Sequence, residues 1–446
     1  MINNFSLKGK KKKLITLLCF FLFNLVSIIF INIDSLFSFS YTILLFFILS
    51  YFIIDNNFLI DNFLVFQLFL FLCLLLFIVQ FSLMPEWFGF TGMYGGVGTD
   101  DSRFYASISD NIETIPWMAR GYSNMDHPFS HFLRFLYPFK IENPLDIIVP
   151  NLLGIAFIPY FTFKVSRQLN LNFKTSYLAF WLVAFCPIIL SNGLILMRDG
   201  WTAFLLICGI FYFIEKELSK YIIVLLMLLY LRLGTGLLLA MLPIFNLKTL
   251  FSSSNSIKNF LILSSILIGI FFGLPIIVDY LLSKGVSGFE RQDFVESYIQ
   301  NADSQSIIFK IYTLPIYLKL PIGLLFFLLL PFLRLEFYTD GILNIRSIMF
   351  TFIMPIVSVV YFKNFVSGVL FAFRNKDYRI IKLIYIFIGL LFVISQMSIQ
   401  PRHKTSVMPI FYILVAYGIY NNDKRSNFLG FTFAILLGVI EIIFIL

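Results

Sequence analysis

Residues 8–13 read KGKKKK, and the apolar run LITLLCFFLFNLVSIIFIN follows at residues 14–32. The run is close to the roughly 20 residues that a helix needs to cross the hydrocarbon core of a bilayer. It is longer than the core of a signal peptide and has no small-residue cleavage site. Lysines collect on the cytoplasmic side of membrane helices. The stretch therefore predicts a first transmembrane helix with its N-terminus in the cytoplasm.

The composition extends this prediction to the whole chain of 446 residues. Hydrophobic residues make up 59% and charged residues only 13%, about half the charged share of a soluble domain, which excludes a soluble protein. The apolar runs are solid blocks rather than alternating strands, so an all-α membrane protein is predicted and a β-barrel is not. The net charge of +9 reflects basic cytoplasmic loops, and no nucleic-acid partner is expected.

The run 221–247 leaves two interpretations open, one long helix or two short halves that meet at Arg232. We expect 11 to 13 transmembrane helices in one domain, 1–446, with a large first outer loop at about 84–145 and a second at about 280–306. The cysteines have neither disulfide nor metal spacing and are expected to be buried in apolar runs. The apolar runs lie at 14–32, 37–54, 62–83, 146–163, 177–195, 201–215, 221–247, 260–279, 316–334, 347–362, 381–397, 406–420 and 428–446.

An acidic pair stands in the first predicted outer loop. Asp100 and Asp101 follow a glycine-rich stretch and precede Tyr105. One carboxylate could act as a general base, or the pair could hold Mg²⁺ or Mn²⁺. A solvated turn before an amphipathic helix is the alternative. No other cofactor is predicted, and Tyr105 is a candidate contact for the sugar or the acceptor.

Two histidines lie further along the same loop. His127 and His131 have the i, i+4 spacing of a zinc pair, but no third ligand stands at a recognisable spacing, so no metal site is predicted there. Pro128 indicates that a helix begins at this point. The histidines are expected to face the outer head groups or a substrate sugar.

Arginines interrupt the apolar runs at two places. Arg198 and Asp199 form a predicted outer turn, where Asp199 would orient Arg198 towards a phosphate. The alternative is a snorkelling arginine beside its ion-pair partner. Arg232 lies inside an apolar run, where a charge is costly unless it faces a partner or a wet cavity, so it is a functional candidate.

The last predicted outer turn reads Gln400-Pro401-Arg402-His403-Lys404. Basic residues at an external helix start predict an anion-binding site. Arg402 and Lys404 are candidate phosphate ligands, and His403 is a candidate base. Interfacial anchoring is the alternative, although external basic residues run against the usual charge asymmetry.

These motifs carry a family resemblance. The acidic pair Asp100-Asp101, His127-Pro128, the Arg198-Asp199 turn and the late Arg402-His403-Lys404 stretch resemble the pattern of the GT-C superfamily of membrane glycosyltransferases. Length, span count and the lack of a soluble domain are similar to bacterial O-antigen polymerases of the Wzy type and to EpsG-like proteins.

The resemblance to those polymerases implies that undecaprenyl-pyrophosphate-linked repeat units are joined at the outer face of the bacterial inner membrane. A chain-length regulator would be a partner in addition to the lipid-linked oligosaccharide and the bilayer. The Asp-Asp motif favours the alternative, a GT-C glycosyltransferase that uses a polyprenyl-phosphate sugar. A transporter of lipid-linked oligosaccharide is the second alternative. In either enzyme, Arg198, Arg232 and Arg402 would hold phosphate and Asp100 or Asp101 would take the acceptor proton.

Overall fold

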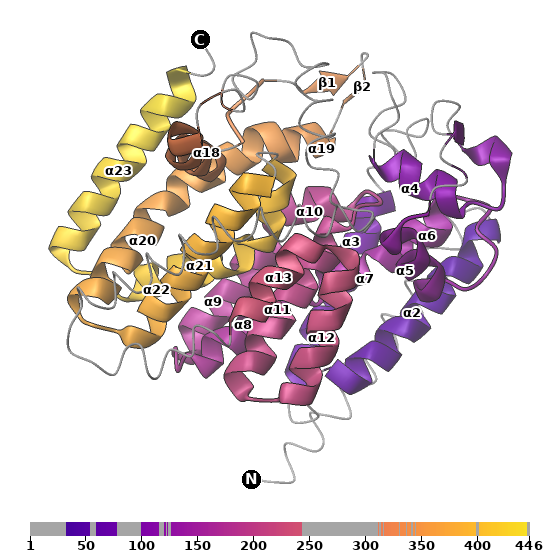
Figure 1. Cartoon of the computed structure of the whole chain (residues 1–446), viewed down its shortest axis with the longest axis horizontal. Coiled ribbons are helices and arrows are strands. Elements are labelled where there is room, and N and C mark those ends of the chain that lie inside the picture. Colours follow the sequence, from indigo (N-terminus) through magenta and orange to yellow (C-terminus); the bar gives the residue numbers. More distant parts are fainter. Residues whose placement is uncertain are drawn as a thin grey trace.

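The computed structural model is almost entirely helical in the residues that it describes (Figure 1). These are 33–53, 59–77, 100–115, 126–242, 316–329, 345–397 and 401–443, with parts of 120–123, 311–314 and 331–343. One two-residue antiparallel ladder joins β1 (Tyr338–Thr339) to β2 (Ile342–Leu343). The predicted all-α fold class is therefore confirmed for the described part of the chain.

The helices follow the predicted runs, with additional short helices in the first predicted outer loop. The first half contains α2 (Ile33–Ile53), α3 (Leu59–Phe77), α4 (Asp100–Ile108), η2 (Ile112–Thr114), α5 (Pro128–Leu136), α6 (Leu145–Asn151), α7 (Leu153–Ala156), α8 (Ile158–Gln168), α9 (Phe173–Ala184), α10 (Pro187–Gly193), α11 (Asp199–Glu215), α12 (Leu218–Leu231) and α13 (Leu233–Met241). The second half contains α18 (Ile316–Leu329), α19 (Ile345–Ser347), η4 (Ile348–Ile353), α20 (Met354–Arg374), α21 (Tyr378–Met397), η5 (Pro401–Ser406), α22 (Met408–Tyr420) and α23 (Lys424–Ile443).

Two helical stretches in the described residues are long and apolar enough to cross a membrane, 145–168 and 348–374. A third span results if α9 and α10, which meet at a bend of 46°, are taken as one. Several other apolar helices, including α12 and α22, are shorter than a span. The predicted runs 14–32 and 260–279 and the loop 280–306 lie outside the described residues. The predicted count of 11 to 13 spans therefore remains a prediction.

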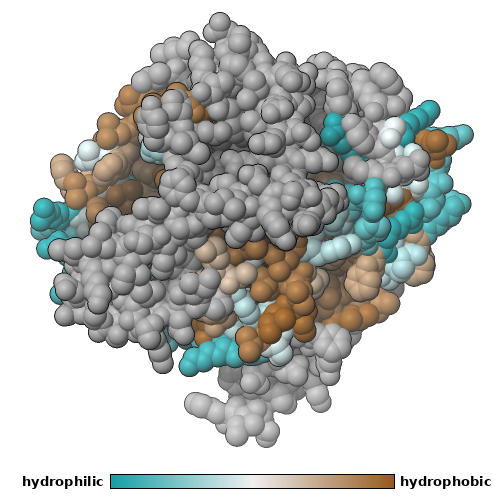
Figure 2. All heavy atoms as spheres, in the orientation of Figure 1, coloured by the Kyte–Doolittle hydropathy of each residue, from teal (hydrophilic) through white to brown (hydrophobic). Residues whose placement is uncertain are grey.

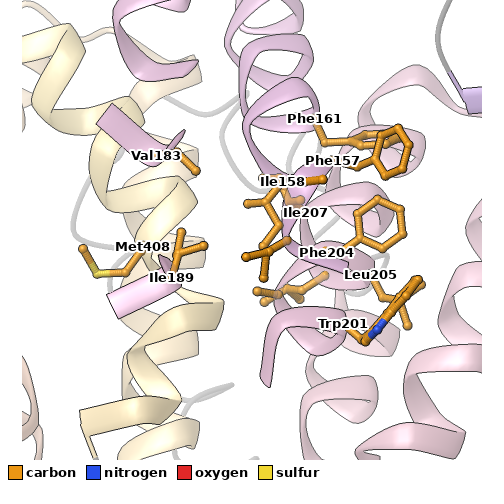
Figure 3. Packing of buried hydrophobic residues seen from close by; sticks show 14 of the residues in the cluster. Phe157, Ile158, Phe161, Val183, Ile189, Trp201, Phe204, Leu205, Ile207 and Met408 are labelled. Atoms are coloured by element: carbon orange, nitrogen blue, oxygen red, sulfur yellow. The ribbon is translucent and has the colours of Figure 1, made fainter. Parts of the chain in front are cut away.

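The core lies where α8 and α11 pack side by side. The ring of Phe204 lies 6.1 Å from that of Phe157 and 5.7 Å from that of Phe161, measured between centroids (Figure 3). Trp201 continues this aromatic layer towards the start of α11 and packs edge-on against Phe204. Offset and edge-on rings of this kind add to the stabilisation that comes from burial alone.

Glycines let three C-terminal helices approach closely. A Cβ on Gly368 of α20 would lie 2.9 Å from the Cα of Gly418 of α22, and one on Gly418 would overlap the carbonyl oxygen of Asn364. Gly430 of α23 faces Ser367 and the Lys363 carbonyl in the same way. Small residues at helix contacts are typical of membrane bundles, in which helix association depends on close packing.

Apolar side chains also cover much of the outside. Exposed large hydrophobics lie on α2, α12, α20 and α23, and include Phe37, Leu226, Val360 and Phe431. Figure 2 shows such apolar patches in the lower part of the view and at its upper left, with hydrophilic residues around α4 and α5 at the right. Contiguous apolar surface on several helices indicates association with a membrane. Cys73, Cys186 and Cys208 are buried and free, as expected; Cys19 lies outside the described residues.

Candidate functional site

The segment that carries Arg198 is fixed by a buried asparagine. The Asn151 side-chain amide donates hydrogen bonds to the carbonyl oxygens of Ile195, at 3.1 Å, and Met197, at 3.4 Å. The indole of Trp201 donates to the Asn151 side-chain oxygen at 3.0 Å. Asn151 thus holds the irregular stretch between α10 and α11 and places Arg198 and Asp199 at the start of α11.

Arg232 lies at the tip of a helical hairpin. Its backbone is extended, with φ −156° and ψ 90°, and separates α12 from α13. The Tyr221 hydroxyl donates to the Leu239 carbonyl at 2.6 Å, so α13 folds back along α12. A Cβ on Gly236 would lie 2.7 Å from the backbone of Leu229, and glycine permits this close return. Of the two interpretations of the run 221–247, the described part, up to residue 242, confirms the one with two short halves that meet at Arg232.

At the tip of this hairpin, the guanidinium of Arg232 contacts a buried carboxylate. Arg232 Nη1 donates to Asp199 Oδ1 at 2.7 Å, with 9% of the arginine side chain and 4% of the aspartate side chain exposed. The guanidinium of Arg232 also contacts Nδ1 of His403. Burial and the neighbouring charge of Arg232 hold the pKa of His403 well below its usual value, so this imidazole is neutral. A neutral imidazole has one acceptor nitrogen, so it accepts a hydrogen bond from one guanidinium group only.

Arg402 reaches the same place from the other half of the chain. Its Nε lies 3.3 Å from His403 Nε2, and its Nη1 lies 3.6 Å from Met197 Sδ. Asn192 of α10 fixes η5, because its amide donates to Thr405 Oγ1 at 2.7 Å and to the Arg402 carbonyl at 3.3 Å. Two loops about 200 positions apart are thereby joined.

His127 brings the first predicted outer loop to the site. It is the N-cap of α5, and its Nδ1 accepts a hydrogen bond from the backbone N–H of Phe129 at 3.0 Å. Its Nε2 lies 3.3 Å from Arg198 Nη1. The helix start predicted at Pro128 is confirmed.

These six residues, Arg198, Asp199, Arg232, Arg402, His127 and His403, are called the arginine cluster below. A neutral imidazole has one donor and one acceptor nitrogen. Because Nδ1 of His127 accepts the hydrogen bond from Phe129, its Nε2 carries the hydrogen and lies beside the donors of Arg198. His403 offers one acceptor nitrogen to two guanidinium groups, those of Arg402, which donates to Nε2, and of Arg232, which contacts Nδ1. The cluster collects hydrogen-bond donors and positive charge around the single carboxylate of Asp199.

Three candidates predicted from the sequence lie apart from this cluster. Lys404 is buried and donates to the Leu328 carbonyl at 2.6 Å, with its ammonium over the ring of Phe327. His131 is exposed and pairs with Asp126 at 2.5 Å. Tyr105 is fully buried in the core.

The acidic pair is described only by its backbone. Asp100 and Asp101 form the first turn of the helix α4. α4 packs against α5, and the ring of Phe104 lies 5.0 Å from that of His127. No group of three His, Cys, Asp or Glu residues that could hold a metal occurs among the described residues. The proposed Mg²⁺ or Mn²⁺ site at the pair remains a prediction.

One predicted relationship is different in the structure. Asp199 was expected to orient its neighbour Arg198, but its carboxylate pairs with Arg232. The start of α11 and the hairpin tip meet only in the folded chain, so the adjacency of Arg198 and Asp199 in sequence was misleading. Asn151 and Asn192, which hold the two loops, have no motif that distinguishes them from other asparagines in apolar runs.

Comparison with known proteins adds no relative: no protein-family model, curated protein or solved structure matches this chain.

Proposed function

We propose that the chain is a membrane glycosyltransferase that joins polyprenyl-pyrophosphate-linked repeat units, as an O-antigen polymerase of the Wzy type does. The proposal rests on one observation, the convergence of the guanidinium groups of Arg198, Arg232 and Arg402 from three separate loops. Guanidinium groups match the oxygens of phosphate in geometry and charge. The proposed place of action is the outer face of the bacterial inner membrane, and the proposed substrate is an undecaprenyl-linked oligosaccharide.

The donor pairs within the arginine cluster support an anionic ligand. Arg198 Nη1 and the Nε2–H of His127 lie 3.3 Å apart, and both can donate to one oxygen placed between them. At His403, Arg402 Nε donates to Nε2 at 3.3 Å while the Arg232 guanidinium contacts Nδ1, so two guanidinium groups meet a ring that has one acceptor nitrogen. A phosphate oxygen at either place would accept charge-assisted hydrogen bonds from these donors. The buried Asp199 carboxylate keeps Arg232 fixed at the hairpin tip.

In the proposed reaction the acceptor hydroxyl attacks the anomeric carbon and the bond to the donor phosphate breaks. Negative charge grows on the leaving phosphate, and preorganised donors in a dry site stabilise it. Arg198 and Arg402 would supply these donors. A group outside the cluster must take the acceptor proton, because the acceptor nitrogen of the neutral His403 already receives a hydrogen bond from Arg402.

A GT-C glycosyltransferase with a polyprenyl-phosphate sugar is the second candidate. The packing of α4 on α5 favours it, because His127 is the N-cap of α5 and the first turn of α4 carries Asp100 and Asp101. One of these carboxylates would be the general base, with or without a divalent cation. Both candidates share the phosphate site, and they differ in the acceptor.

Deletion of the gene and gel analysis of the surface glycan tests the proposal. We expect glycan that carries a single repeat unit, which is the product of a strain without its polymerase. A full ladder that lacks one sugar would support the second candidate. Loss of all surface glycan, with lipid-linked repeat units retained on the cytoplasmic side, would indicate a transporter and contradict both.

A further inference from the structure

A second polar site lies at the opposite end of α22 from the arginine cluster. α22 runs from Met408, beside η5, to Tyr420, about 20 Å at 1.5 Å per residue. A cavity of about 690 Å³ opens there between the α8–α9 turn, the α20–α21 turn and the end of α22. Its volume is within the roughly 300–1,000 Å³ of small-molecule sites.

One residue that lines this cavity has a buried hydroxyl without a partner. Thr175 of α9 is fully buried, and its Oγ1 has no hydrogen-bond partner. An unpaired buried hydroxyl costs free energy. A ligand oxygen that reaches this hydroxyl from the cavity would relieve that cost.

The charges around the cavity nearly balance. Two basic residues, Lys376 and Arg379, and one carboxylate, Asp377, line it. Asp377 lies 3.6 Å from Arg379 Nε and accepts a hydrogen bond from the Tyr417 hydroxyl at 3.2 Å. Two helices begin at the cavity, α9 and α21, while α20 and α22 end there. The partial charges of these helix ends have opposite signs and oppose each other. Such a site does not select a strong anion.

The remaining lining favours groups that both donate and accept hydrogen bonds. Four asparagines contribute to it, Asn170, Asn172, Asn375 and Asn421. Three of them make one hydrogen bond to their own helix: Asn172 accepts from the Thr175 N–H, and Asn375 and Asn421 donate to backbone carbonyls. A side-chain amide has two donor hydrogens and an acceptor oxygen, so each retains further capacity for the hydroxyl of a sugar, which both donates and accepts. The rings of Tyr378, which is half-exposed, and Phe371 add apolar faces of the kind on which a pyranose ring rests.

We propose that this cavity, between the α8–α9 turn, the α20–α21 turn and the end of α22, binds a neutral saccharide. Thr175, Asp377 and the asparagine amides bind its hydroxyl groups. The inference is independent of the proposed glycosyl transfer, whose residues lie at the other end of α22, so each can fail without the other.

Saturation-transfer NMR of the full chain in nanodiscs tests this inference. The probes are methyl α-glucopyranoside, methyl β-galactopyranoside and N-acetylglucosamine, titrated to the wild type and to two variants. We expect at least one sugar to bind, and to bind about tenfold more weakly to Thr175→Val and to Asp377→Asn, since one hydrogen bond contributes on this order. Thr175→Val is expected to melt no lower than the wild type, because it removes an unpaired hydroxyl.

The same change far from the cavity is the matched control. Thr432→Val on α23, where the hydroxyl donates to the Phe428 carbonyl, should leave sugar binding unchanged. Absence of binding by all three sugars, or equal binding by the wild type and both cavity variants, would overturn the proposal. Stronger binding of inorganic phosphate than of any sugar would assign the cavity to anions and overturn it as well.

Discussion

Arg232 Nη1 lies 2.7 Å from Asp199 Oδ1, and this ion pair fastens the tip of the α12–α13 hairpin to the start of α11. Both side chains are buried, so the attraction between them is screened little by solvent. A buried charge is tolerated only with a partner. The pair therefore fixes the guanidinium of Arg232 beside His403, and through it the position of η5 relative to α11.

Removal of the carboxylate should destabilise the protein. Asp199→Asn leaves Arg232 buried beside a neutral imidazole, and loss of one partner of a buried pair costs about 3–5 kcal/mol. Thermal unfolding in detergent measures the change, and the double variant Asp199→Asn/Arg232→Gln should recover part of it. Asp126→Asn breaks the exposed pair with His131 and serves as the control, with little effect expected. Equal stability of Asp199→Asn and Asp126→Asn would contradict the role of the buried pair.

His127 should contribute to activity through its Nε2–H rather than through its role as the N-cap of α5. Asparagine is a good N-cap, so His127→Asn keeps α5 while it removes the donor beside Arg198. We expect normal protein in membranes with strongly reduced polymer on the gel. His131→Asn, four residues later on the exposed side of α5, should give wild-type polymer. The same chain length from both variants would remove His127 from the site.

The contact of α20 with α22 should not tolerate a methyl group. Gly418→Ala places a Cβ against the Asn364 carbonyl, so the two helices must move apart. We expect a loss of about 1–3 kcal/mol, as for other overpacked contacts, measured by thermal unfolding. Gly389→Ala on α21 meets no atom within 4 Å, and it should stabilise the helix slightly. If Gly418→Ala were as stable as Gly389→Ala, the close approach of the helices would be wrong.

The two ends of the bundle should lie on opposite sides of the membrane. Lys140 follows α5, whose N-cap His127 belongs to the arginine cluster, and Lys376 lies in the α20–α21 turn; both are exposed. The charge rule places the first outside and the second in the cytoplasm. In a cysteine-free background, an impermeant thiol reagent added to intact cells should label Lys140→Cys and leave Lys376→Cys unlabelled until the cells are opened. Labelling of both variants in intact cells would contradict this topology.

The sequence predicted the helices better than their contacts. The start of α5 at Pro128 and the break at Arg232 follow from local properties, the fixed φ of proline and the cost of a charge in an apolar run. The pairing of Arg232 with Asp199 joins positions 33 apart, and it depends on how the hairpin packs. Local patterns carry no information about such a contact.

The candidate site shows the same difference between what a local pattern predicts and what depends on the folded chain. Arg198, Arg402 and His403 could be recognised as basic residues at the ends of apolar runs and Arg232 as a charge within one, and the fold brings them together. Lys404 has the same signature, but its side chain turns towards the Leu328 carbonyl. The sequence could not distinguish the two cases, because neighbouring side chains of a 3₁₀-helix point in different directions.

Complementation of a deletion strain with Arg402→Lys tests the central claim most directly, that the arginine cluster holds the phosphate of a lipid-linked glycan. Lysine keeps the charge but acts as a point charge without the planar fork of donors. By analogy with the loss of one oxyanion donor, the rate should fall roughly 100- to 1,000-fold. At equal membrane level, the variant is expected to leave glycan with a single repeat unit on the gel. Wild-type chain length from Arg402→Lys would contradict the claim.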